Sequence, residues 1–199
     1  MSNPRLKYGQ LAPEGLAKMS ALEHYLNTET GLEASLRELV RLRASLMNGC
    51  EYCIRLHTSE LRKMNETAER IAGVEDWRNS EIYTKRERAA LAWAEAVTNI
   101  QEGHAPDVLY EAVRAEFTEV ETVNLTLVIT TINAWNRISI ALGTHLGHGD
   151  GGGRVSNNRQ WRGKWRRRRN ARVSPLRRQK APPPVETTLL WVERMLSWG

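Results

Sequence analysis

The feature that most constrains the fold is a long apolar segment at 120–142, which is followed by Gly143. Thr118 and Glu121 precede it with the spacing of a capping box, in which both side chains bond the free backbone amides of a first helical turn. The β-branched residues at 128–132 would also suit a strand, but the length of the segment and its cap favour a helix. No other stretch is convincing as a strand, so the sequence predicts an all-α protein. The segment is longer than a small bundle needs to bury, which favours association of several copies.

Six further helices are indicated by stop signals and by apolar residues at three- and four-residue spacing. They are predicted at about 13–27, 32–47, 50–64, 67–72, 84–100 and 106–116. A second capping box, Thr84 with Glu87, opens the helix at 84–100, which is apolar on more than one face and is expected to be central. The polar stretch 75–83, which contains Trp77, is expected to be a link. The prediction is a bundle of about six to seven helices.

Charge divides the chain at about residue 146. Residues 1–146 contain 16 Lys and Arg and 20 Asp and Glu, a balance of −4, whereas residues 147–199 contain 13 and 3, a balance of +10. The second part is rich in Gly, Arg, Pro and Trp and has no apolar period. Such a composition cannot bury enough apolar surface to offset the entropy of ordering. We therefore expect one folded domain at 1–146 and a basic, disordered tail at 147–199.

The tail also contains groups that suit nucleic acid. Trp161, Trp165 and the run Arg166–Arg169 combine stacking surfaces with positive charge. A composition that begins so abruptly after a complete domain is equally typical of sequence read from another frame or of an unselected extension. Nonspecific adhesion to anions is a further alternative. Nucleic-acid binding is therefore not the expected function.

The chain begins without an apolar segment behind a basic start, and no run of about 18 apolar residues occurs in it. We expect neither a secretory signal nor a membrane span, and a cytoplasmic location. In that compartment, two cysteines at C-x-x-C spacing indicate redox chemistry or a metal rather than a structural disulfide.

Both cysteines of the chain lie close to a histidine. Cys50, Cys53 and His57 are three and four residues apart, so they share one face of a helix. Sulfurs at this spacing can form a disulfide. The positive end of the helix dipole and a nearby imidazole each favour the reactive thiolate, but they act on different cysteines and do not identify the nucleophile. Glu38, one helix earlier, could orient His57 or accept a proton through it.

Other interpretations of these residues remain open at this point. The cysteines could be inert buried thiols, and Glu38 an ordinary helix charge. The four side chains could also bind zinc, although closed zinc sites are usually built from two C-x-x-C-like knuckles. We expect no metal and no bound cofactor.

The spacing of the four residues resembles a known signature. The pattern consists of Glu38, eleven residues, Cys50-x-x-Cys53, three residues and His57. It is similar to the motif of the alkylhydroperoxidase D (AhpD)-like branch of the carboxymuconolactone decarboxylase family. The resemblance covers about 10–143. Its further matching positions are Arg41, Arg43, Ser59-Glu60, 84–89, Leu91, Trp93 and 132–137.

The resemblance implies an AhpD-like helical bundle that forms trimers or hexamers, and a thiol-dependent peroxidase activity. By position, Cys53 would be the peroxidatic cysteine, which is oxidised to sulfenic acid, and Cys50 the resolving cysteine, which forms a disulfide with it. Glu38 and His57 would form the proton relay. The electron donor would be a dithiol such as a lipoylated protein.

The chain departs from AhpD proper at Tyr52, where the family's fullest relay has a histidine. A phenol does not exchange protons near neutral pH as an imidazole does, so the peroxidase activity could be weaker or the substrate different. The alternatives are a lyase that acts on a lactone acid, as in the other branch of the family, and a general disulfide oxidoreductase. The presence of C-x-x-C argues against the lyase.

Overall fold

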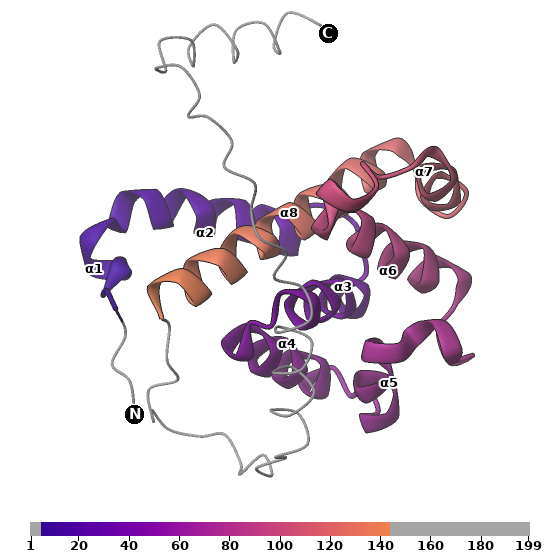
Figure 1. Ribbon diagram of the computed structural model, residues 1–199, viewed down its shortest axis with the longest axis horizontal. Helices are drawn as coiled ribbons and strands as arrows, with labels where there is room; N and C mark the ends of the chain where they lie inside the picture. The colour runs from indigo at the N-terminus through magenta and orange to yellow at the C-terminus, as the bar shows by residue number, and fades with distance from the viewer. Residues whose placement is uncertain (1–4, 144–199) are drawn as a thin grey trace, which may run out of the picture. The chain divides into compact units, whose positions relative to one another are not determined.

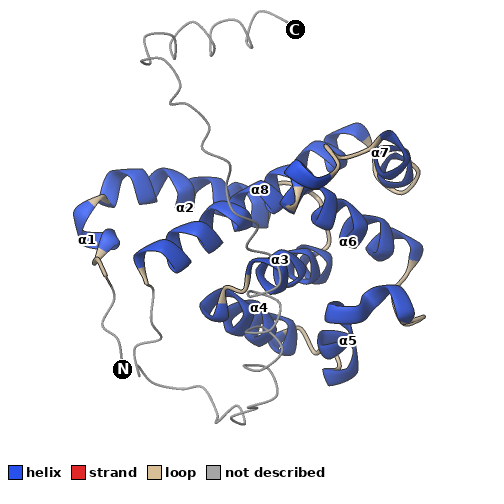
Figure 2. Ribbon diagram, viewed as in Figure 1, coloured by secondary structure: helices blue, strands red, loops and turns tan. Residues whose placement is uncertain are grey.

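The computed structural model describes residues 5–143, and in this part of the chain the regular structure is helical, without β-strands (Figures 1 and 2). The all-α prediction is confirmed. Seven of the eight α-helices match the seven predicted ones, and α1 was not predicted. The helices are α1 (Tyr8–Leu11), α2 (Pro13–Thr28), α3 (Ala34–Asn48), α4 (Glu51–Lys63), α5 (Ala68–Gly73), α6 (Lys85–Thr98), α7 (Asp107–Arg114) and α8 (Glu119–Leu142), with 3-10 helices η1 (Val74–Asn79) and η2 (Ile100–Glu102). The boundary at 146 and the predicted tail at 147–199 lie outside the described residues.

The helix ends follow the local chemistry of the sequence. Both predicted capping boxes are present, since the Thr84 and Thr118 hydroxyls accept from the backbone amides three residues on and the glutamates there bond back. Gly49 and Gly143 follow α3 and α8 in the left-handed conformation, with φ of 69° and 70°. A residue with a Cβ is strained at such angles, so glycine ends a helix there at the least cost.

The stretch 75–83, predicted to be a polar link, connects α5 to α6 and also contributes two aromatic side chains to the core. Trp77 lies in η1 and is 4% exposed, and Tyr83 is also 4% exposed. The Trp77 indole donates to Glu95 at 2.8 Å, and the Tyr83 hydroxyl donates to the carbonyl of Arg70 at 2.5 Å. The sequence did not indicate the burial of Trp77 and Tyr83, because two isolated aromatic residues among polar ones give no helical period.

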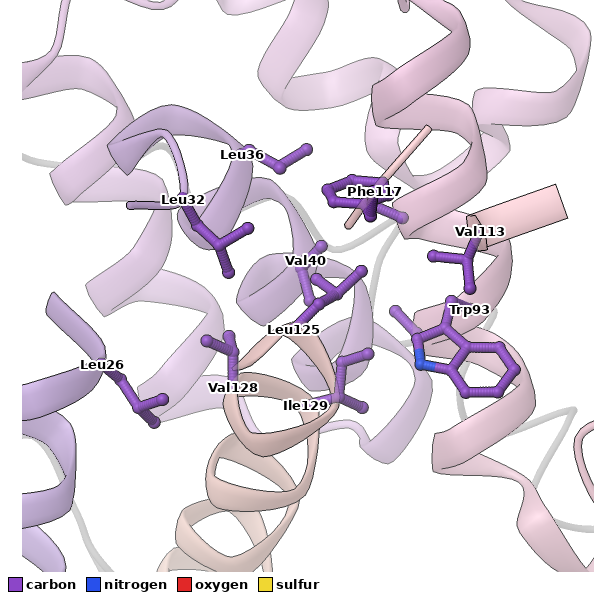
Figure 3. Close-up of a cluster of buried hydrophobic side chains, with 12 residues drawn as sticks. Leu26, Leu32, Leu36, Val40, Trp93, Val113, Phe117, Leu125, Val128 and Ile129 are labelled. Atoms are coloured by element: carbon purple, nitrogen blue, oxygen red, sulfur yellow. The ribbon is translucent and has the colours of Figure 1, made fainter. Parts of the chain in front are cut away.

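Helix α3 is the centre of the bundle and packs against α4, α6 and α8 (Figure 1). It contributes residues to three buried clusters. The first cluster joins α2, α3, α6, α7 and α8 (Figure 3). Its members are Leu26, Leu32, Leu36, Val40, Ala90, Trp93, Ala94, Val113, Phe117, Leu125, Val128 and Ile129. Helix α6 contributes to this cluster and to the second, which explains why it is apolar on more than one face.

The second and third clusters lie on other sides of α3. The second joins α3 to α4, α5, η1 and α6, and it contains Leu39, Leu42, Leu46, Leu61, Ile71, Val74, Trp77, Tyr83 and Leu91. The third is small and brings α3, the start of α4 and α8 together; it contains Ala44, Cys50, Cys53 and Ile132. The cysteine pair is therefore part of the core between α3 and α8.

Apolar side chains also remain on the surface of α2 and α8. In the predicted apolar stripe of α2, only Leu26 is buried, whereas Leu22 is 37% exposed. On α8, Val120, Val123 and Ile140 are exposed. By length and composition α8 is apolar enough to cross a membrane, and 44% of its most apolar window is buried within the protein.

Candidate functional site

The cysteine pair lies where α4 begins. Gly49 turns the chain after α3, and Cys50 is the N-cap of α4, so the helix begins at Glu51, one residue after the predicted start. Its sulfur accepts a hydrogen bond from the Cys53 amide at 3.4 Å. Cys50 and Cys53 form a disulfide with their Cα atoms 5.3 Å apart, a usual separation for this bond. The two residues are 2% and 3% exposed, so the disulfide is buried.

A second pair of predicted site residues meets across α3 and α4. The Nδ1 atom of His57 lies 2.7 Å from Oε2 of Glu38, and both side chains are buried. His57 is four residues beyond Cys53, so the two lie on the same face of α4. The other ring nitrogen, Nε2, is buried and has no hydrogen-bond partner among residues 5–143. The fold thus holds a histidine with one bonded and one free nitrogen on the face that carries Cys53.

Glu38 is ionised in spite of its burial. Burial raises the pKa of Glu38, but the hydrogen bond and charge of His57, followed by the charge and hydrogen bond of Arg41, act in the opposite sense and outweigh it. The pKa of Glu38 therefore lies below its ordinary value. Near neutral pH the residue is a carboxylate, which can only accept hydrogen bonds.

The structure adds three residues that the sequence pattern did not assign to the site. Arg41 donates to Glu38 at 2.6 Å, to Glu23 at 2.8 Å and to Asn27 at 2.9 Å. The spacing of Glu38 and Arg41 along one helix could have indicated their pairing. Nothing in the sequence places Glu23 and Asn27 beside them, because α2 is connected to α3 by a turn whose direction the pattern does not give.

A buried network of side-chain amides fixes the end of α3 against α8, next to the cysteines. Asn48 donates to Asn133 at 2.8 Å and to Asn136 at 2.9 Å, and Asn136 donates to Ser45 at 3.1 Å. Asn136 is fully buried. Because unpaired amides are costly in a protein interior, this network favours one arrangement of α3 and α8. Residues 132–137 had matched the family pattern without an assigned role.

Two aromatic side chains pack against the cluster that contains the disulfide. Tyr52 and Trp135 are half-buried and pack against the cluster that contains Cys50 and Cys53. Tyr52 is the residue that replaces the histidine of AhpD proper. In this position it adds an aromatic ring and a phenol to the packing around this cluster.

The zinc alternative has no geometric support in the described part of the chain. Residues 5–143 contain no group of three or more His, Cys, Asp or Glu side chains arranged to hold a metal ion. The two oxygens of Glu38 are instead bonded to Arg41 and His57. The geometry gives an oxidised dithiol beside a carboxylate–histidine pair.

Comparison with known sequences places the site in a family context. The family model described as "Carboxymuconolactone decarboxylase family" matches residues 13–96, a range that includes all four predicted site residues. The uncharacterized protein YdfG of Bacillus subtilis (strain 168) is 43% identical over 139 residues, which cover 70% of this chain and 94% of YdfG. The uncharacterized protein YnjA of Escherichia coli (strain K12) is 28% identical over 111 residues, which cover 56% of this chain and 60% of YnjA.

Solved structures show the same fold. A protein of unknown function from Agrobacterium tumefaciens, provisionally described as the antioxidant defence protein AhpD, is 39% identical and superposes with a TM-score of 0.70 over 73% of this chain and 100% of its own. The AhpD core of an uncharacterized peroxidase-related protein from Ralstonia eutropha JMP134 superposes with a TM-score of 0.62 at 20% identity, over 70% of this chain and 74% of its own. At that identity the likeness concerns the fold alone.

Proposed function

The chain belongs to the carboxymuconolactone decarboxylase family and has an AhpD-like fold, and from this premise we propose that it is a thiol-dependent peroxidase. One observation carries the proposal. A disulfide between Cys50 and Cys53 lies at the start of the helix that also holds His57, whose ring is bonded to the buried carboxylate of Glu38. This is the arrangement of a nucleophile, a base and the group that orients the base.

In the proposed first step, His57 removes the proton from the Cys53 thiol through Nε2. The thiolate attacks one oxygen of a hydroperoxide, so that a sulfur–oxygen bond forms and the oxygen–oxygen bond breaks. The departing alkoxide takes the proton from His57 and leaves as an alcohol. Cys53 becomes a sulfenic acid, oxidised by two electrons, and the peroxide is reduced by two.

In the second step, Cys50 resolves the sulfenic acid. Its sulfur attacks the sulfur of Cys53, the disulfide forms, and the hydroxyl leaves as water with the proton from Cys50. The Cα separation of 5.3 Å supports this pairing, since it requires little backbone movement. The assignment of Cys53 as nucleophile rests on its position on the face of α4 that holds His57.

The cycle closes when an external dithiol reduces the disulfide and is itself oxidised to a disulfide. We propose a vicinal or lipoyl-type dithiol, such as a lipoylated protein, as the donor in the cytoplasm. Tyr52 and Trp135 pack against the buried cluster that contains the two cysteines. Apolar side chains near the disulfide favour organic substrates with apolar groups.

We further propose that the protein functions as a homo-oligomer, a trimer or a hexamer. The exposed apolar residues of α2 and α8, among them Leu22, Val120 and Val123, support this assignment. Light scattering gives the molar mass in solution, and a mass of one chain would exclude the oligomer without affecting the chemistry proposed for a single subunit.

The activity is tested by following hydroperoxide consumption with dihydrolipoamide as donor. The wild type is expected to turn over, and Cys53→Ser to fall to the rate without enzyme. Ser59→Ala, an exposed position on the same helix, is the matched control and should retain activity. Equal rates for wild type and Cys53→Ser would rule out the proposal.

The family description also names a decarboxylase, which would be a lyase acting on a lactone acid. That chemistry does not use a cysteine pair. The variant with both cysteines changed to serine separates the two functions, because a lyase would keep its activity and a peroxidase would lose it. A third function, general disulfide oxidoreductase, would appear as reduction of protein disulfides that is faster than reduction of peroxides.

A further inference from the structure

Arg41 is almost completely buried, and its hydrogen bonds within residues 5–143 go to side chains other than those of the cysteine pair. Its side chain is 5% exposed and lies between two carboxylates, Glu38 on its own helix at 2.6 Å and Glu23 on α2 at 2.8 Å. Asn27 of α2 accepts a further hydrogen bond at 2.9 Å. A buried guanidinium with three oriented acceptors has a fixed position and a fixed charge.

The two oxygens of Glu38 have different partners. Oε1 accepts from Arg41, and Oε2 lies against Nδ1 of His57. A guanidinium has only donors and stays protonated in proteins, so Oε1 must be an acceptor. The lowered pKa of Glu38 is consistent with this. With the carboxylate ionised, Oε2 is also an acceptor, and Nδ1 of His57 must carry the hydrogen.

This constraint leaves the lone pair of neutral His57 on Nε2. That atom is buried and has no hydrogen-bond partner within residues 5–143. It is the nitrogen that is free to take a proton. Arg41 bonds Glu38, and Glu38 bonds His57. These two contacts therefore determine which ring nitrogen of His57 is the base, although Arg41 bonds neither cysteine in the described residues.

We propose that Arg41 is a positioning residue of the relay, which keeps Glu38 an acceptor-only carboxylate and thereby holds His57 as the Nδ1–H tautomer with a basic Nε2. The expected change in kcat/KM rests on the peroxidase function proposed above. The tautomer of His57 does not depend on whether peroxide is the substrate. Within residues 5–143, two further charged groups interact with the pair, namely Glu23 on α2, which bonds Arg41, and Arg37 on α3, which interacts electrostatically with Glu38 and Arg41.

The test compares Arg41→Gln with Arg43→Gln. Arg43 is two residues further along α3, half-buried, and bonded to Glu95 and to carbonyls of η1 rather than to the relay. The first readout is the tautomer of His57, from the ring ¹⁵N chemical shifts assigned with a His57→Gln variant. Wild type and Arg43→Gln are expected to show Nδ1–H, and Arg41→Gln a mixture of the two tautomers. Arg41→Lys, which keeps the charge, is expected to restore Nδ1–H.

The second readout is the pH dependence of kcat/KM for hydroperoxide. Loss of the positive charge lets the carboxylate–imidazole pair retain a proton to higher pH. In Arg41→Gln the acid side of the profile is therefore expected to move upward in pH, with a loss of at least about tenfold at pH 7, the size typical of groups that orient a catalytic side chain. Arg43→Gln should change only the stability.

A wild-type tautomer and pH profile in Arg41→Gln would show that Arg41 only connects α2 and α3, and would overturn the proposal. If Arg41→Gln does not fold, the double variant Glu23→Gln/Arg41→Gln removes one buried carboxylate together with the guanidinium and is expected to show the same mixture of tautomers. Absence of peroxidase activity in the wild type, with the tautomer result as expected, would contradict the proposed function but not the role of Arg41.

Discussion

At the scale of single residues, the site depends on one carboxylate whose two oxygens serve different partners. Glu38 holds the ring of His57 with one oxygen and receives the guanidinium of Arg41 with the other. Its charge is buried, and an unpaired buried charge is strongly destabilising. The same contacts that prepare the histidine as a base therefore also contribute to the stability of the fold.

The stability of the protein should consequently fall in acid through Glu38. Because the pKa of Glu38 is lowered in the folded state, its contribution is present above the ordinary value of 4.5 and is lost as the pH falls through the folded-state pKa. The free energy of unfolding, measured with urea from pH 7 to pH 3, should decline less below about pH 4.5 in Glu38→Gln than in wild type. Glu81→Gln, at an exposed position, should show the wild-type decline.

Only part of the site could be predicted from the sequence. Cys50, Cys53, His57 and Glu38 could be selected because their spacing along two helices resembles a known motif. Arg41 is bonded to Glu38, but Glu23 and Asn27 come from a helix whose direction depends on packing against α8. The contact of Trp135 with the cysteine cluster depends on packing in the same way, because α8 is far from the cysteines in sequence.

At the scale of the elements, glycine at the end of α3 determines where the cysteine helix begins. Gly49 has φ of 69°, and no atom lies within 4 Å of a Cβ placed there. The residue type at position 49 is therefore restricted by the backbone conformation and not by a lack of space. Gly15, inside α2, is also free of neighbours but has no unusual φ.

These two glycines give opposite expectations for the same substitution. Gly49→Ala should lower the free energy of unfolding by about 1–2 kcal/mol, the cost of a left-handed residue with a Cβ. Gly15→Ala should raise it by about 0.5–1 kcal/mol, because alanine loses less entropy in a helix. Chemical denaturation measures both. A stabilising Gly49→Ala would contradict the role given to this turn.

The elements themselves were largely predictable, since stop glycines and capping boxes are local signals. The 3-10 helix η1 was not. Trp77 and Tyr83 are recognised as core residues only once α5 and α6 surround them. The burial of the apolar residues of α2 was also not predictable. An apolar stripe in the sequence does not show whether it packs within the same chain or against another chain.

At the scale of the whole molecule, charge separates two parts of the sequence. The balance is −4 for residues 1–146 and +10 for residues 147–199. The four predicted site residues lie in the first part, as do the partners that the structure describes for them within residues 5–143. We therefore expect the chemistry to be independent of the second.

Deletion of residues 147–199 should leave the peroxide-reduction rate and the midpoint of thermal unfolding unchanged. Retention on a heparin column at low salt should be lost, because the basic residues that cause it are removed. A truncated protein with a much lower peroxidase rate would show that the second part serves the site.

The central claim is that the sulfur of Cys53 is the atom that peroxide oxidises. Trapping of the sulfenic acid tests this most directly. The reduced Cys50→Ser protein is treated with one equivalent of cumene hydroperoxide in the presence of dimedone, and the adduct is located by mass spectrometry of the peptides. Without the resolving cysteine, we expect one adduct, on Cys53, and none in Cys53→Ser. An adduct on Cys50 in Cys53→Ser together with no adduct in Cys50→Ser, or no adduct in either protein, would contradict it.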